Sequence, residues 1–132
     1  MLVTVEAVQE GVSTPASVRV HSKVGTAVAL WMGPVEATSH EHHVEWTVDE
    51  DIAWTKNAGP ATSATSALWE AGDRIVFRGR LTLTEDGAAI LELGGTLILL
   101  DLADPPPPDD ADGSWIEFHA ARDNVSVYPY QL

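Results

Sequence analysis

The stretch DRIVFRGRLTLTEDGAAILELGGTLILLDL, residues 73–102, consists of three β-rich runs separated by short turns that contain glycine. Alternation with a period of two places successive side chains on opposite faces of a strand. A glycine within two or three residues between such runs, as at Gly87 and at Gly94 and Gly95, is typical of a β-hairpin. The stretch therefore predicts a three-stranded antiparallel meander.

Runs of the same character extend over the rest of the chain, and no long segment has apolar residues at helical spacing. One of them begins at His43 or just before it and places Val44, Trp46, Val48, Ile52 and Trp54 at positions of the same parity. Glu50 interrupts this apolar face, so we expect a bulge or bend there. The further runs cover residues 2–8, 17–22, 26–32, 114–120 and 125–130.

This pattern predicts an all-β fold of eight or nine short strands with little helix, arranged as a small antiparallel barrel or as a sandwich. An elaborated OB-like barrel is compatible with it. The length of 132 residues is that of one domain, so we expect a single β domain over residues 1–132. Within it, residues 55–71 are expected to be irregular with one helical turn near 63–70, and residues 103–113 to form a stiff loop rich in Pro and Asp.

The charge excludes several classes of ligand. Seven Lys and Arg face twenty Asp and Glu, which gives a formal net charge of −13. Such a field repels phosphate backbones and anionic membrane surfaces, so we expect neither nucleic acid nor membrane as a partner. It would accelerate encounter with a basic protein. The chain has no cysteine and no recognisable export signal, so we expect a cytoplasmic protein.

Two acidic loops and one tryptophan are the candidate contact residues for such a partner. A rigid loop loses little entropy on binding, and aromatic side chains anchor interfaces. The leading hypothesis is a non-enzymatic acidic binding domain, an inhibitor or immunity-type protein that masks a basic protein surface and needs no cofactor. The candidate residues are Asp49, Glu50, Asp51, Trp69, Asp109, Asp110 and Asp112.

The histidines support an alternative of a different class. His40 and His42 are two apart, so a strand would point both to one side, and His119 comes from a distant strand. With Glu45 nearby, this arrangement resembles a cupin metal site, which implies one divalent transition metal and a metal- or small-ligand-binding β-barrel enzyme. Only two residues separate His42 from Glu45, whereas the cupin motif has three or four. The structural alternative is that these histidines simply lead into a strand.

Three arginines on one strand are a further candidate site. Arg74, Arg78 and Arg80 have the same parity and could bind a carboxylate or phosphate, since guanidinium groups match such anions. They could equally pair across strands with acidic neighbours such as Glu92 or Glu117. Of the five tryptophans, Trp46 and Trp54 are expected in the core, and Trp69 is expected to be the most exposed.

The sequence contains no nucleophile elbow, phosphate-binding loop, dinucleotide fingerprint or zinc-protease motif. An enzyme thus has no motif to support it, although scattered side chains on a small barrel could still catalyse a reaction. A third hypothesis is an accessory or oligomer-forming structural subunit that associates through its tryptophans and edge strands.

Overall fold

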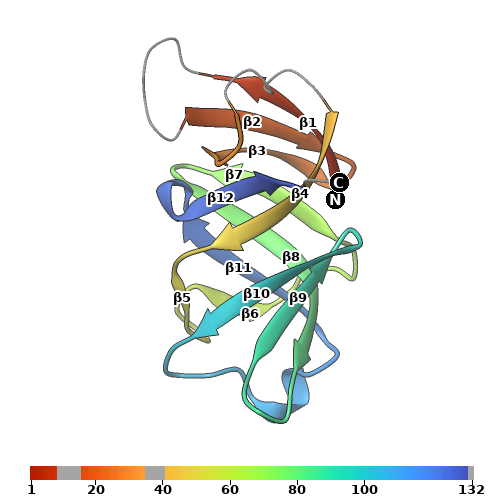
Figure 1. Cartoon of the computed structure of the whole chain (residues 1–132). Helices are drawn as coiled ribbons and strands as arrows, with labels where there is room; N and C mark the ends of the chain where they lie inside the picture. The colour runs from red at the N-terminus through yellow and green to blue at the C-terminus, as the bar shows by residue number, and fades with distance from the viewer. Residues whose placement is uncertain (9–15, 35–40, 131–132) are drawn as a thin grey trace.

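The computed structural model describes residues 1–8, 16–34 and 41–130, and these form an all-β structure with two short 3₁₀ turns (Figure 1). The all-β prediction is confirmed. The described residues contain twelve strands, more than the eight or nine expected, because three short strands, β5, β6 and β7, were not predicted as separate elements.

Five strands close into a barrel. β1 (Leu2–Ala7), β2 (Ala16–Ser22) and β3 (Gly25–Trp31) form an antiparallel meander. β4 (Glu41–Val48) pairs with β1 and with β12 (Val125–Pro129), and β12 pairs in parallel with β3. The ring order β1-β2-β3-β12-β4 is that of an OB barrel whose fifth strand is the last strand of the chain.

All remaining strands lie between β4 and β12 in the chain. Figure 1 shows most of them below the barrel, with β7 beside β3. β8 (Arg74–Leu83) is their centre: it pairs with β7 (Ala67–Ala71) and β9 (Ala89–Leu93) along one edge and with β11 (Trp115–Ala121) along the other. β10 (Thr96–Leu102) pairs with β9 and, in parallel, with β5 (Asp51–Ile52). β6 (Ala58–Pro60) pairs with β11.

The predicted meander of residues 73–102 is present as β8, β9 and β10. The turn between β9 and β10 is formed by Gly94 and Gly95, whose φ angles of 57° and 86° lie in the region that glycine adopts without strain. Leu93 and Thr96 pair on either side of it, as in a two-residue hairpin.

One continuous hydrophobic core joins the barrel to the inserted strands. Trp46 from the barrel stands edge-on to Phe77 of β8 at a centroid distance of 5.8 Å, and Phe77 stacks on Phe118 of β11 at 4.8 Å. Because these rings cross the boundary between the two groups of strands, neither group has a separate core. Trp46 is buried as expected, and Trp54 is partly buried against the same core.

The expectation for residues 55–71 is wrong in its details. The segment contains β6 and β7 and no helical turn. β7 becomes a strand because the turn at Gly72 and Asp73 folds it back on β8, with Ala71 opposite Arg74. The polar composition that indicated a loop belongs to residues 61–66, which form the turn between β6 and β7.

The loop at residues 103–113 is present and includes the 3₁₀ helix η2 (Asp109–Ala111). A second 3₁₀ helix, η3 (Arg122–Asn124), connects β11 to β12. Among the described residues, no helix has the length and apolarity needed to cross a membrane.

Gly25 should be the most sensitive glycine in the barrel. Its φ is +147°, and a Cβ there would lie 1.8 Å from the carbonyl oxygen of Leu68, where β3 meets β7. We expect Gly25→Ala to lower the free energy of unfolding by about 2–4 kcal/mol, because the strands would have to separate. Urea unfolding followed by circular dichroism measures this.

Gly59→Ala is the matched control for this substitution. A Cβ at Gly59 meets no atom within 4 Å, so the free energy of unfolding should change by less than about 0.5 kcal/mol. Equal effects of the two substitutions would contradict the close approach of β3 and β7.

Candidate functional site

The carboxylate of Glu50 is the centre of the main polar cluster in the described residues. It lies at the bend after β4, where the sequence predicts an interruption of the apolar face. Oε2 accepts hydrogen bonds from Arg74 Nη2 and, at 3.3 Å, from Asn57 Nδ2. Oε1 accepts from the backbone N–H of Ala121 at 2.8 Å and from Asn124 Nδ2 at 3.0 Å.

This environment favours the charged form of Glu50. Burial is the largest single influence and raises its pKa, but hydrogen bonds from Ala121, Asn124 and Arg74, with the charge of Arg74, together hold the pKa below its usual value. A carboxylate that accepts several hydrogen bonds is stabilised in its ionised state. Glu50 was predicted to contact a partner, but four donors already occupy its two oxygens.

Arg74 also fixes the state of His119 on β11. Arg74 Nε donates to His119 Nδ1, and Arg74 Nη2 donates to the His119 carbonyl at 3.3 Å. Arginine is always a donor, so Nδ1 must carry a lone pair and the proton of the neutral ring must be on Nε2. Burial, followed by the charge of Arg74, lowers the pKa of His119 in spite of the opposing charge of Glu50.

The arginine row is present, and its members have different partners. Arg78 Nε donates to Glu117 at 2.9 Å across the β8–β11 pair, which is the cross-strand pairing considered from the sequence. Arg80 lies opposite Glu92 in the strand register and donates to the carbonyl of Gly113 at 3.3 Å. Carboxylates thus already occupy Arg74 and Arg78, and the prediction that this row binds an anion remains untested.

Glu117 has a second set of partners in the turn before β7. Its Oε1 accepts from the N–H and the hydroxyl of Thr62 at 3.2 and 3.0 Å. Burial raises its pKa, but the hydrogen bonds from Thr62 and Arg78 and the charge of Arg78 lower it overall. Trp69, which was expected to be the most exposed tryptophan, is half-buried on β7 with Arg78 stacked 4.9 Å from its ring centre.

His40 lies outside the described residues, so the structure places only His42 and His119 of the three histidines proposed as metal ligands. His42 is half-buried near the start of β4, with its ring centre 5.3 Å from that of Trp31. The strand from His42 to Val48 is roughly 20 Å long, and His119 lies beyond its far end, beside Glu50. No group of three or more His, Cys, Asp or Glu that could hold a metal occurs in the described part of the chain.

The predicted acidic contact residues are mostly at the surface. Asp49 and Asp51 are exposed at the corner between β4 and β5, and Asp109 and Asp110 are exposed on η2. Asp112 is exposed too, but its Oδ1 accepts the N–H of Leu83 at 2.9 Å, which fixes the end of β8.

The sequence analysis missed an apolar surface on β9 and β10. Leu97 and Leu99 on β10 are 63% and 71% exposed, and Ile90 lies opposite Leu99 on β9. These three residues, here called the outer apolar patch, line a groove of about 360 Å³ together with Glu45, Trp46 and Thr47 of β4. The sequence contains only a partial signal: TLILLDL is apolar at both parities, which fits a strand buried on both faces as well as a strand with one exposed apolar face.

Acidic side chains border the outer apolar patch. Glu92 lies opposite Leu97, and Asp101 follows Leu99 on the same face of β10. Asp51 of β5 is the register partner of Asp101, so two exposed carboxylates lie side by side on neighbouring strands. Like charges in this position destabilise a sheet.

Comparison with known proteins gives no independent guide to this site, because no family model matches the chain, and neither the characterised proteins nor the solved structures contain a match.

The pKa of Glu50 predicts a specific dependence of stability on pH. Because that pKa is lower in the folded than in the unfolded chain, ionised Glu50 stabilises the fold above the unfolded value near 4.5, and this contribution is lost as the pH falls through the folded value. We expect Glu50→Gln to destabilise the protein at pH 7 by about 1–3 kcal/mol. The difference from wild type should shrink toward pH 3.

Urea unfolding of both proteins at several pH values measures this difference. The neutralisation of other carboxylates is common to both proteins and cancels. Glu85→Gln, at an exposed turn position, is the control and should show no such dependence. A gap between Glu50→Gln and wild type that stays constant from pH 7 to pH 3 would contradict the assignment.

Proposed function

We propose that this chain is a non-enzymatic acidic binding protein that masks a basic surface of another protein, in the manner of an inhibitor or immunity protein. The observation that carries the proposal is the outer apolar patch with its acidic border. Leu97 and Leu99 expose most of their side chains, and clustered exposed apolar residues with a polar rim are characteristic of protein interfaces.

The border gives the sign of the partner's charge. Glu45, Glu92, Asp51 and Asp101 surround the patch, and within the described part of the chain the ion pairs within 4 Å do not include any of them. The adjacent carboxylates of Asp51 and Asp101 repel one another in the free protein. A Lys or Arg of a partner would relieve this repulsion, so binding and local electrostatics favour the same cationic surface.

A second copy of the chain fits this surface less well. Association of two such surfaces would bring the acidic borders of two chains together, each chain carrying a net charge of −13. Self-association through this surface, as the accessory-subunit hypothesis would require, is therefore the less favoured alternative. In the proposal, the carboxylates of Asp49, Asp109 and Asp110 lie outside the contact surface and attract a basic partner over a longer distance.

Apolar and charged residues should have separate effects on binding. In the double substitution Leu97→Ser and Leu99→Ser, loss of the anchors should accelerate dissociation from the basic partner by at least about tenfold. In Asp51→Asn with Asp101→Asn, association should slow several-fold and its salt dependence should flatten. Thermal stability should not fall in the second variant, because it removes neighbouring like charges.

The test begins with proteins from a cell extract that the immobilised chain retains at low salt, followed by stopped-flow kinetics on the retained partner. Val8→Ser is the control, because Val8 is an exposed apolar residue at the end of β1. The proposal expects retention of a basic protein by wild type and by Val8→Ser, and its loss from the leucine variant. Retention of the same protein by the leucine variant would overturn the proposal. So would an association rate that changes neither with salt nor with the substitution of Asp51 and Asp101.

A further inference from the structure

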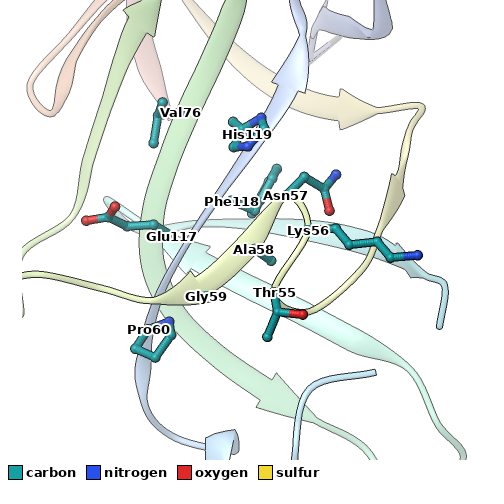
Figure 2. Close-up of a pocket in the computed structure, with 10 residues that line it drawn as sticks. All are labelled: Thr55, Lys56, Asn57, Ala58, Gly59, Pro60, Val76, Glu117, Phe118 and His119. Carbon is teal, nitrogen blue, oxygen red and sulfur yellow. The ribbon is translucent and has the colours of Figure 1, made fainter. Parts of the chain in front are cut away.

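A cavity of about 310 Å³ lies against β6 and β11 (Figure 2). Within the described chain, it shares no lining residue with the groove of the outer apolar patch. Val76, Ala58 and Pro60 contribute apolar surface to it. His119 and Lys56 add polar groups from β11 and from the loop before β6. Predominantly apolar walls with a few fixed polar groups are the usual composition of a small-molecule site.

His119 presents a single defined group to this cavity. Its Nδ1 is occupied by Arg74 Nε–H, so the ring nitrogen left over, Nε2, carries the proton. A cation hydrogen-bonded to one nitrogen polarises the ring and makes the other N–H a stronger donor. In this state neither nitrogen has a lone pair to offer a metal ion. His119 therefore offers a hydrogen-bond donor, Nε2–H, to a ligand that can accept a hydrogen bond.

The charges near the cavity favour an anion. Glu117 lies on its wall, but Arg78 and Thr62 already occupy the Oε1 atom of its carboxylate. Lys56 is exposed on the opposite side and takes part in none of the ion pairs found among the described residues. Arg74 pairs with Glu50 and Arg78 pairs with Glu117, so these four charges compensate one another in pairs. The ammonium group of Lys56 is then the charge on the cavity wall that can attract an anion.

The loop that carries Lys56 is held in a strained conformation. Thr55, on the cavity wall, has a φ of 65°, a value that a β-branched residue adopts at a cost of about 1–3 kcal/mol. Its N–H donates to the Ala58 carbonyl at 2.8 Å, and Asn57 Oδ1 accepts from Ala53 N at 2.8 Å. Asn57 Nδ2 in turn donates to Glu50, so one cluster fixes both the loop and His119. Strain of this kind persists where the surroundings enforce it, and it is concentrated at functional sites.

We propose that this cavity binds a small organic carboxylate with an apolar body. The carboxylate accepts a hydrogen bond from His119 Nε2–H and is attracted by the ammonium group of Lys56, while the apolar part lies against Val76 and Pro60. The proposal is independent of partner binding, because none of its residues belongs to the outer apolar patch.

Benzoate is a suitable probe, since an aromatic carboxylate matches the chemistry and the size of the cavity. In ¹H–¹⁵N spectra of the full chain, we expect benzoate to produce saturable shifts in the backbone amides of residues 55–59 and 117–119, with a dissociation constant in the millimolar range. His119→Phe should weaken binding by at least about tenfold, because it removes a hydrogen bond to a charged group. Lys56→Gln should weaken it several-fold and leaves the Glu50 cluster intact.

Three controls make the result decisive. His21→Phe changes a half-buried histidine on β2, away from the cavity, and should bind benzoate as wild type does. Benzamide has the same shape without the charge and should bind more weakly. Absence of saturable shifts, equal binding of benzoate and benzamide, or binding unaffected by Lys56→Gln and by a folded His119→Phe would overturn the proposal. Binding of inorganic phosphate in preference to benzoate would also overturn it.

Discussion

The structure depends on one partly buried carboxylate at the junction between the barrel and the strands inserted into it. The chain leaves the barrel after Val48 and returns to it at Val125. Glu50 lies on the outgoing path, and its Oε1 accepts from Ala121 and Asn124 on the returning path. Its Oε2 accepts from Arg74, on the central strand of the insertion. A single side chain thus ties together three segments that are far apart in the sequence.

The same carboxylate organises the chemistry of the neighbouring cavity. Glu50 holds Arg74, Arg74 occupies Nδ1 of His119, and Glu50 also accepts from Asn57 in the strained loop. In this region of the described chain, two arginines are paired with carboxylates and Lys56 is not, although the whole chain carries a net charge of −13. Exposed carboxylates lie around the outer apolar patch, at the corner between β4 and β5 and on η2. The two proposals therefore concern surfaces that attract opposite charges: the outer apolar patch a cationic partner, and the cavity an anionic ligand.

Local features of the fold could be predicted from the sequence. The alternation in residues 73–102 and the glycines at its turns act within a few residues, and the hairpins follow from them. The bend at Glu50 follows in the same way from the interrupted alternation of residues 44–54. The closure of the barrel could not be predicted, because it depends on the pairing of β12 with β3 and β4, which are far apart in sequence and carry no local signal. The strand β7 was missed for the same reason: its pairing with β8, and not its composition, makes it a strand.

The candidate site was only partly predictable. The parity of Glu50 marked it as an acid at an apolar position, but its role depends on Asn124 and Arg74, which no spacing connects to it. His119 was identified as a candidate metal ligand, but the contact with Arg74 across β8 and β11 that determines its tautomer has no signal in the sequence. The exposure of Leu97 and Leu99 required knowledge of which face of β10 meets the core.

A double-mutant cycle on Glu50 and Arg74 tests the central claim most directly. The free energies of unfolding of wild type, Glu50→Gln, Arg74→Gln and the double variant give the coupling energy of the pair. A hydrogen-bonded pair that is mostly shielded from solvent should have a coupling of about 1 kcal/mol or more. A coupling near zero would contradict the account, because the two side chains would then contribute independently and the carboxylate would not hold the insertion to the barrel.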